Sequence, residues 1–504
     1  MASCDIERYR EILRKLQNEG ERTTALNDLK HFIDEKSGPE IVPVIRNVGI
    51  TQIVRCIDQE KSLQGLACDA LKMIFLKLDI GDVIKVFTSH IMYLLRHDKV
   101  SARLIAVEEV SRAVTSDINI LSFPEYVDVF VAVIQLLLDN DERIANRAVE
   151  ITSRLPNEAY PRVLEEMKIT LDHTASSKCY AFDVVTNISE RSQDLFNLSV
   201  DTGYIDIMLS ELETKDFLYH LNVLTFLTKL STNIHAMNLL VKKGVLEMIT
   251  VMIQDLHQNS LEHLLTPGYL KFIGTIAHHY PREIFNKYST LIEYVIEKID
   301  SADTSNIVAL DTLGFIGATV EGKLSLIAIG KKYLEAVDKV CLIIKDHTTV
   351  LRLAAINCLA SLVGIHKYPN EPDTEPIDKR VTLMTREWFR SLSTHPSSIQ
   401  FLFQMCKYPF ADIKMAALNL LDAVCQHQWG QELVATTEGF VTYLLDRSKD
   451  ISKETSELKY DIIKRLSTSM SFEPNVLELL ETYVTQGPFY PAREGFEISM
   501  EQGN

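Results

Sequence analysis

The sequence predicts an all-α protein built from stacked helical repeats, and three observations lead to this prediction. Apolar residues recur at positions i, i+3, i+4 and i+7, which form one stripe along a helix, and this set returns eleven times along the 504 residues. Signals for β-structure are scarce, because Asn-Gly and Asp-Gly turns do not occur and alternating β-branched runs are few. With 19 glycines and 15 prolines, the composition excludes a collagen-like or broadly disordered chain.

The eleven stripes begin at anchor residues that follow one another at a nearly regular distance. In order, the anchors are Ala25, Ala67, Ala106, Ala148, Ala181, Val223, Tyr269, Ala309, Ala355, Ala417 and Lys459. The spacings between anchors run from 33 to 62 residues with a median of 42. This median lies inside the ~40–47-residue period of HEAT and armadillo repeats. The sequence therefore predicts a HEAT/armadillo-like α-solenoid of about eleven repeats.

Each repeat is predicted to be a helix pair, because a second apolar segment lies between most anchors. Residues 126–138 and 291–299 are examples of such segments. One pair cannot bury its apolar face alone, so neighbouring pairs are expected to stack. Several repeats also place an acid before the stripe helix and a base inside it, as HEAT repeats do: Asp98 with Arg103, Asp346 with Arg352, and Asp412 with Lys414.

The repeats predict one domain, a single curved solenoid over residues 1–485, followed by a tail. Because a solenoid gains core with every repeat, this length needs no division into globular domains. The Pro- and acid-rich run 368–376 predicts an exposed loop at about 366–380. Residues 486–504 lose the periodicity, which predicts a flexible C-terminal tail.

Charge and cysteine usage restrict the partners and the location. The chain carries 69 acidic and 52 basic residues, a net charge of −17, whereas nucleic-acid-binding proteins usually show a basic surplus. No apolar run reaches the ~20 residues of a membrane helix, and the N-terminus shows no secretory signal. The eight cysteines form no Cys-x-x-Cys pair, which indicates reduced thiols. We therefore expect no nucleic acid and no membrane among the partners, and a location in the cytoplasm or the nucleus.

One motif suggests an enzyme at first sight. Residues 317–323, Gly-Ala-Thr-Val-Glu-Gly-Lys, match most of the G-x-x-x-x-G-K phosphate-binding loop. In that loop the next residue is a serine or threonine that binds Mg²⁺, whereas here it is Leu324. The preceding residues have helical spacing, and a phosphate-binding loop follows a buried strand. The run therefore predicts a helix end, with Gly317 and Gly322 in the left-handed conformation of a turn.

Other signals of catalysis or metal binding are weak. His278 and His279 are adjacent, so their rings would point ~100° apart on a helix, and no His-Glu-x-x-His motif occurs. There is no Gly-x-Ser-x-Gly elbow and no cysteine in a recognisable catalytic context. We therefore expect no enzyme activity, no metal ion and no cofactor.

Position i+2 lies ~200° around each helix from the anchor, opposite the buried stripe. In order, these residues are Asn27, Asp69, Glu108, Glu150, Asp183, Thr225, Lys271, Asp311, Asn357, Asn419 and Asp461. All eleven are polar, and we call them the outer column. If the stripe helices line the concave side of the solenoid, the four consecutive acids from Asp69 to Asp183 form an acidic ladder with steps of ~8–10 Å. Polar residues are also expected on any solvated face, so a binding ladder and a plain surface both stay open.

Several short runs in the second half of the chain occur in an order known from one protein family. They are Thr266–Gly274, Leu310–Gly317 continuing through Val320–Lys323, Trp388–Leu392, Tyr408–Phe410, Gln428–Trp429, Gly439–Phe440, Asp446–Ser448, Lys459–Tyr460 and Gly487–Tyr490. In these runs the sequence resembles the 26S proteasome non-ATPase regulatory subunit 5 family. The first ~250 residues match that family only in repeat style and total length.

The resemblance implies a chaperone of 26S proteasome assembly that acts on the base of the 19S regulatory particle. Such a chaperone binds the C-terminal domain of the ATPase called regulatory subunit 7, travels with regulatory subunit 4 and non-ATPase subunit 2, and leaves before the particle is complete. Lys271 and Asp311 lie in matching runs, whereas the acidic ladder does not. Both groups belong to the outer column. The candidate partner-binding residues are Asp69, Glu108, Glu150, Asp183, Lys271 and Asp311.

Two other functions are compatible with parts of the sequence. A generic solenoid adaptor in transport or trafficking would bind extended basic peptides in its groove, and fold and charge alone do not distinguish it from a chaperone. A nucleotide-binding enzyme would use residues 317–323. The matching C-terminal runs favour the assembly chaperone over both.

Overall fold

The computed structural model describes residues 2–116, 126–256, 262–346, 348–365, 378–448 and 452–490. These residues form α-helices and short 3-10 helices and contain no strand, so the all-α prediction is confirmed. The chain divides into two compact units, unit 1 (Met1–Ala236) and unit 2 (Met237–Asn504). The predicted loop falls mainly on 366–377 and most of the predicted tail on 491–504, which both lie outside the described residues.

Every anchor lies in an α-helix, and we call these eleven the stripe helices. They are α2 (Arg22–Asp34), α5 (Lys61–Lys77), α7 (Val100–Ser116), α9 (Glu142–Ser153), α11 (Ala175–Arg191), α14 (Phe217–Leu230), α17 (Glu262–His279), α20 (Ser305–Ile316), α23 (Thr349–Val363), α26 (Ala411–Cys425) and α29 (Lys453–Leu466). The residues at i, i+4 and i+7 are buried in all eleven. At i+3, Asp28 is exposed and Phe226 is half-buried, while the other nine are buried.

Most segments between stripe helices contain two α-helices in place of the predicted single second helix. In unit 1 they are α3 (Gly38–Val48), α4 (Thr51–Arg55), α6 (Asp82–Leu95), α8 (Val127–Gln135), α10 (Tyr160–Met167), α12 (Gln193–Asp201) and α13 (Tyr204–Ser210), preceded by α1 (Ala2–Lys15). In unit 2 they are α16 (Val245–Leu256), α18 (Pro281–Lys287), α19 (Ser289–Lys298), α21 (Val320–Ala328), α22 (Lys331–Asp346), α24 (Lys379–Arg390), α25 (Ser398–Cys406), α27 (Gln428–Thr436) and α28 (Phe440–Leu445), and α30 (Pro474–Gln486) follows the last stripe helix. Helix α15 (Ile234–Lys242) contains the boundary between the units.

Most repeats therefore contain three helices, and the helix-pair prediction is wrong for them. The physical reason is visible where the connecting segment breaks in two. Gly203 (φ 87°) separates α12 from α13, and Gly330 (φ 75°) separates α21 from α22. Glycine adopts this left-handed backbone conformation without the steric cost that a Cβ brings. These three-helix repeats still belong to the predicted HEAT/armadillo-like class, which the structure confirms.

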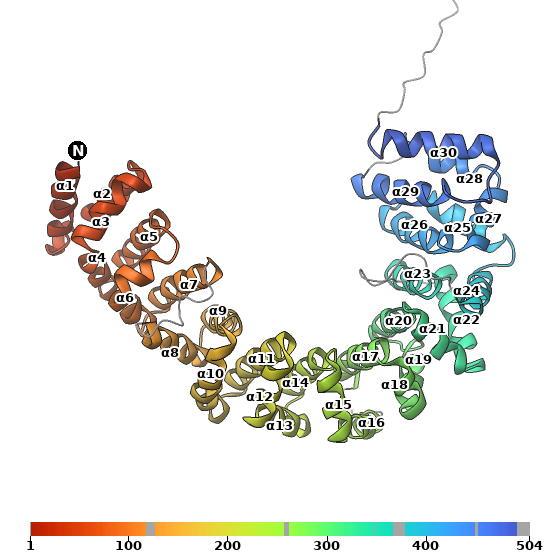
Figure 1. Cartoon of the computed structure of the whole chain (residues 1–504), viewed down its shortest axis with the longest axis horizontal. Helices are drawn as coiled ribbons and strands as arrows, with labels where there is room; N and C mark the ends of the chain where they lie inside the picture. The colour runs from red at the N-terminus through yellow and green to blue at the C-terminus, as the bar shows by residue number, and fades with distance from the viewer. Residues whose placement is uncertain are drawn as a thin grey trace, which may run out of the picture. The chain divides into compact units, whose positions relative to one another are not determined.

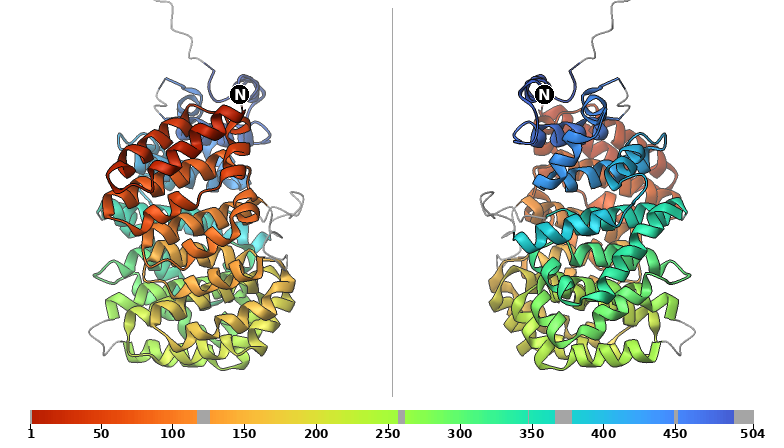
Figure 2. Two further views of the ribbon diagram at one scale, coloured as in Figure 1. Left: turned by 90° about the vertical axis from the view of Figure 1, so that its left-hand side faces the viewer. Right: turned by 90° about the vertical axis from the view of Figure 1, so that its right-hand side faces the viewer.

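Within each unit the stripe helices pack against one another in chain order. Each one from α2 to α14 contacts the next in unit 1, and each one from α17 to α29 contacts the next in unit 2. Figure 1 shows the stripe helices along one side of each unit and the connecting helices along the other, and Figure 2 gives two further views of the same helices. The core of each unit lies between these two rows, and the outer column lies on the free side of the stripe helices.

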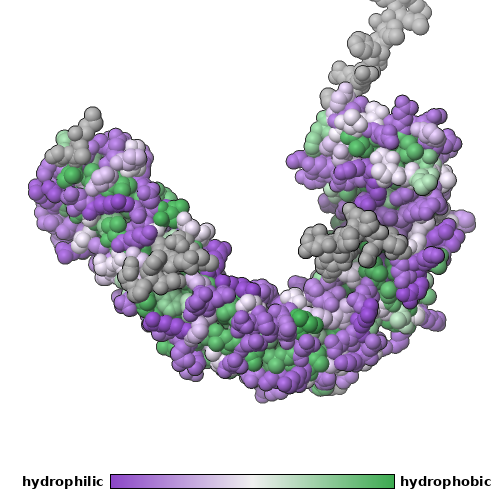
Figure 3. Space-filling model, viewed as in Figure 1, coloured by the Kyte–Doolittle hydropathy of each residue, from purple (hydrophilic) through white to green (hydrophobic). Residues whose placement is uncertain are grey.

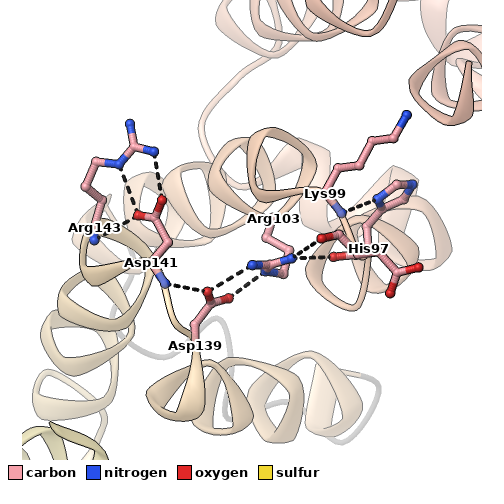
Figure 4. A network of polar contacts seen from close by, with 7 residues as sticks. His97, Lys99, Arg103, Asp139, Asp141 and Arg143 are labelled. Carbon is pink, nitrogen blue, oxygen red and sulfur yellow. Dashed lines mark hydrogen bonds and ion pairs between the residues drawn. The ribbon is translucent and has the colours of Figure 1, made fainter. Parts of the chain in front are cut away.

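A part-buried arginine network connects successive repeats (Figure 4). Arg103, three residues before the anchor of α7, donates to the backbone oxygens of His97 and Asp98, both at 2.8 Å. It also forms a two-bond ion pair with Asp139, which precedes α9, at 2.5 and 2.9 Å. Arg352 of α23 likewise donates to Ile344 O at 2.7 Å. In these two repeats the base inside the stripe helix therefore binds backbone carbonyl groups near the end of the preceding helix, and for Arg103 these include the carbonyl group of Asp98 and not its carboxylate.

The prediction of one repeat body from residue 1 to 485 is tested by solution scattering. If the sequence prediction of one continuous repeat array is right, the full chain should scatter as an extended particle. Its radius of gyration should exceed the ~23 Å that the scaling for compact domains gives for 504 residues. A value near that figure would count against a single solenoid.

Candidate functional site

The outer column lies outside the core in both units. Ten of its eleven residues are exposed, and Asp183 is half-buried. The four acids of the ladder lie on α5, α7, α9 and α11 of unit 1, whereas Lys271 and Asp311 lie on α17 and α20 of unit 2. The candidate residues therefore form two groups, one in each unit.

In unit 1 the acidic ladder is interleaved with basic residues. Lys30 of α2 lies 3.0 Å from a carboxylate oxygen of Asp69 on α5. Lys72 of α5 lies 3.8 Å from Glu108 on α7. Both lysines stand at position i+5 of the preceding stripe helix, so each ion pair connects two repeats. Since these pairs are exposed to solvent, each is worth ~0–1 kcal/mol of stability.

The other two acids of the ladder also have polar partners. Glu150 accepts from Arg147 of its own helix at 2.6 Å. Asp183 accepts a hydrogen bond from Asn187 at 3.2 Å. Burial raises the pKa of Asp183, and the charge of Lys229 and the hydrogen bond from Asn187 act in the opposite direction. The acidic ladder is therefore a chain of polar pairs. Its basic partners Lys30 and Lys72 were not predicted from the sequence, although both stand at position i+5 of their repeats.

The two candidates of unit 2 have a different environment. Lys271 and Asp311 are exposed on neighbouring helices, and neither forms an ion pair with another described residue. Partial desolvation of the Asp311 carboxyl raises its pKa. Asp311 also borders a hollow of about 330 Å³, together with His278, Phe315 and Asn357. In unit 2 the outer column thus presents an uncompensated carboxyl group beside a concave surface.

Residues 317–323 connect α20 to α21 through a tight turn. The helix end that the sequence predicts is confirmed, since α20 ends at Ile316 and Thr319 caps α21 by accepting the N–H of Gly322 at 3.0 Å. The predicted left-handed glycines are wrong, because Gly317 has φ −81° and Gly322 lies inside α21. Glycine is needed here for space. A Cβ at Gly322 would collide with the carbonyl oxygen of Ile316.

The lysine of this motif points into the protein. Lys323 is completely buried, and its Nζ donates to Gly317 O, to Ala318 O at 3.3 Å and to Ser361 O at 3.1 Å. Burial lowers the pKa of Lys323 to about 7. The amine thus joins the end of α20 to the end of α23, and it is not exposed to a phosphate group in solvent.

The same junction recurs two repeats later, which explains the motif as part of the repeat. Gly430 and Gln431 stand 13 and 14 residues after their anchor, as do Gly322 and Lys323. A Cβ at Gly430 would collide with the carbonyl oxygen of Val424, and Gln431 donates to Cys425 O at 2.9 Å. A side-chain donor at this position, buried in Lys323 and half-buried in Gln431, therefore caps the preceding stripe helix in both repeats.

We expect no nucleotide binding at residues 317–323. The lysine is engaged by three carbonyl groups, and Leu324 provides no hydroxyl group for Mg²⁺. Millimolar Mg-ATP should leave the melting temperature of the protein unchanged in a thermal-shift assay. A saturable increase would contradict this interpretation of the motif.

The described residues contain no cluster of metal ligands, and most of the cysteines are buried. In the part of the chain that the structure describes, no three His, Cys, Asp or Glu side chains gather so as to hold a metal ion. Six of the eight cysteines are buried, and burial raises the pKa of the Cys341 thiol to about 12. No helix among the described residues is long and apolar enough to cross a membrane. Figure 3 shows hydrophilic side chains over most of the visible surface of each unit.

Comparison with known proteins assigns the chain to a protein family. The sequence model of the family described as "Proteasome non-ATPase 26S subunit" matches residues 6–504. The chain belongs to this family. The "26S proteasome non-ATPase regulatory subunit 5" of Homo sapiens is 26% identical over 410 residues, which cover 79% of each chain. The protein of the same name from Drosophila melanogaster is 28% identical over 329 residues, 65% of this chain and 63% of its own.

A solved structure supports the fold of this proteasome-family member independently. Importin beta matches it with a TM-score of 0.59 over 92% of this chain and 57% of its own, at 13% sequence identity. At this identity the likeness concerns the helical-repeat fold alone. The proteasome-related role is indicated by the family match and not by this structure. The resemblance seen in the C-terminal runs is thereby confirmed.

Proposed function

We propose that this chain is an assembly chaperone of the 26S proteasome. It binds the C-terminal domain of the proteasomal ATPase regulatory subunit 7 on the free side of its stripe helices. It acts on the base of the 19S regulatory particle, in an intermediate with regulatory subunit 4 and non-ATPase subunit 2, and dissociates before the particle is complete. The observation that carries the proposal is the family match over residues 6–504.

The surface chemistry of the stripe helices is consistent with a transient complex. The outer column is polar throughout, and its ion pairs in unit 1 are exposed. Exposed charges of this kind affect the association rate and its salt dependence more than the final affinity. A partner held mainly by such contacts can leave when later subunits compete for it.

The environment of Lys323 supports a role without catalysis. The one motif with an enzymatic likeness is a helix junction whose lysine is buried. We propose that the protein catalyses no reaction and needs no cofactor. We propose the cytoplasm, and also the nucleus, as its location, because assembly of the proteasome base requires access to its ATPase subunits.

Neutralising the acidic ladder is expected to slow binding of the client. The ladder variant carries Asp69→Asn, Glu108→Gln, Glu150→Gln and Asp183→Asn, which remove four charges at nearly constant shape. At low salt it should bind the isolated C-terminal domain of regulatory subunit 7 several-fold more slowly than the parent, as measured by stopped-flow fluorescence. At high salt the difference should shrink, because the charges are screened.

A matched control removes four acids that lie on no stripe helix. Glu158→Gln, Asp172→Asn, Asp201→Asn and Glu213→Gln change exposed residues of the same unit and alter the net charge equally. This control should bind at the rate of the parent. If the ladder variant binds as fast as the control, the ladder is only a solvated face. If the parent does not bind the domain at all, the proposed function is wrong.

A further inference from the structure

Two adjoining hollows lie on the free side of the stripe helices in unit 2. The first borders α20 and α23 and has a volume of about 330 Å³, within the ~300–1,000 Å³ range of ligand pockets. The second borders α23 and α26 and has a volume of about 210 Å³. They share Ala318 and Ser361, so together they form one depression across three neighbouring helices, which Figure 1 shows side by side. We call this depression the Asp311 groove.

Small residues create the floor of the Asp311 groove. A Cβ at Gly314 would lie 3.1 Å from the Cα of Cys358, so α20 and α23 approach each other closely at this point. A Cβ at Gly364 would lie 3.0 Å from the Cβ of Ala423 on α26. Because no long side chain rises from these positions, the surface is hollowed between the larger residues on the rim.

Asparagine side chains form part of the rim. Asn357 borders the first hollow and Asn419 the second, and both belong to the outer column. Both are exposed, and neither side chain makes a hydrogen bond to another described residue. A carboxamide offers one donor group and one acceptor, which match the N–H and C=O groups of an extended backbone. Packed helices lie ~8–10 Å apart, a distance that about three residues of an extended chain span at ~3.3 Å each.

The first hollow also provides a site for one cationic side chain. The Asp311 carboxyl has no counter-ion among the described residues, so charge complementarity favours a basic group. Beside it, Phe315 is 43% exposed, and its ring is stacked on His278 with centroids 3.9 Å apart. A planar guanidinium can pair with a carboxylate through two hydrogen bonds and lie against an aromatic ring, which an ammonium group does less well. This combination favours arginine.

The acidic ladder of unit 1 lacks these properties. Asp69, Glu108 and Glu150 already have basic partners within 4 Å. Asp311 differs from them by having an uncompensated charge, a hollow and an aromatic ring in one place. The outer column is therefore chemically specialised at its α20 position.

We propose that the Asp311 groove binds an extended peptide segment of a partner protein and that one arginine of this segment enters the first hollow. Asp311 pairs with the guanidinium, Phe315 packs against its plane, and Asn357 and Asn419 hold the peptide backbone. The inference goes beyond the proposed function, since it does not require the partner to be a proteasomal ATPase.

The test uses the full chain and two fluorescein-labelled peptide pools that differ in one residue. Each peptide is an acetylated nine-residue amide with random Ala, Ser, Gln and Val on both sides of a central residue. The central residue is arginine in one pool and citrulline, its neutral isostere, in the other. Fluorescence anisotropy should show that the parent binds the arginine pool roughly threefold to tenfold more tightly.

Three variants separate the contribution of Asp311 to arginine recognition from that of the two asparagines to backbone binding. Asp311→Asn should abolish the preference for arginine, whereas Asp461→Asn, which changes an exposed acid of the same column outside the groove, should keep it. The double variant Asn357→Ala and Asn419→Ala should weaken binding of both pools equally and preserve their ratio. Equal binding of the two pools by the parent, or an unchanged preference in Asp311→Asn, would overturn the proposal.

A second measurement uses the unmodified chain and does not depend on the folding of any variant. Carbodiimide-driven coupling of glycine ethyl ester modifies accessible carboxyl groups, and mass spectrometry locates the products. The arginine pool should protect Asp311 and leave Asp461 reactive, while the citrulline pool should protect Asp311 less. Equal labelling of Asp311 with and without the arginine pool would also overturn the proposal.

Discussion

Replacing Arg103 with alanine is expected to lower the free energy of unfolding by up to ~3–5 kcal/mol, the cost of removing one partner of a fully buried ion pair, because its ion pair with Asp139 is part-buried. The side chains of Arg103 and Asp139 are 15% and 4% exposed. Without the guanidinium, Asp139 would remain buried without its cation, and the backbone oxygens of His97 and Asp98 would lose a donor. Urea unfolding followed by circular dichroism measures the effect.

Figure 4 also contains the matched control for this experiment. Arg143 pairs with Asp141 at 2.8 Å, in an ion pair of the same chemistry whose arginine is 67% exposed. Arg143→Ala should change the free energy of unfolding by less than ~1 kcal/mol. Equal losses in Arg103→Ala and Arg143→Ala would show that burial of the Arg103 pair contributes nothing, and that this pair does not join the repeats as inferred above.

The stability of the protein is expected to depend on pH through Lys323. Burial lowers the pKa of Lys323 to about 7 in the folded protein, from the ordinary value of 10.5 in the unfolded chain. Between these two values the unfolded chain binds more protons, so stability rises as the pH rises through this window. Below pH 7 the Lys323 amine is protonated in the folded protein, and burying its charge lowers the free energy of unfolding. Hydrogen bonds to three carbonyl groups offset part of this loss.

The variant Lys323→Met isolates this contribution, because methionine fills a similar volume and does not titrate. From pH 7 to pH 9 the parent should gain ~2 kcal/mol of unfolding free energy relative to the variant. Burial lowers the pKa of the nearby His427 from its ordinary value of 6.5, away from the chosen range. A difference that is independent of pH would show that the amine stays protonated in the fold.

The core could be predicted from the sequence because helical periodicity is a local property. A residue at i+4 or i+7 shares the face of its anchor whatever the rest of the chain does, and these positions are buried in all eleven stripe helices. Asp28 is an exception at i+3, and it lies in α2, the first of these helices, which has a neighbouring stripe helix on one side only. Lys459 is buried as an anchor although it is charged, because its Nζ donates to Asp446 O at 2.9 Å.

The site was less predictable, since it depends on how adjacent repeats pack. The pairing of Lys30 with Asp69 joins residues 39 positions apart and requires the rotation of one helix relative to the next. The hollow beside Asp311 arises where Gly314 lets α20 approach α23, and periodicity does not report that distance. Gly274 and Gly314 stand at i+5 of two successive repeats. This recurrence of glycine could have indicated that the helices approach each other closely.

We propose above all that this family member works in proteasome assembly by binding a proteasomal ATPase. The most direct measurement is affinity purification of the tagged full chain from cell extract, followed by quantitative mass spectrometry. We expect proteasomal ATPases to dominate the captured proteins, with regulatory subunit 7 foremost and regulatory subunit 4 and non-ATPase subunit 2 beside it. Capture of transport or trafficking proteins without any proteasomal ATPase would contradict the claim.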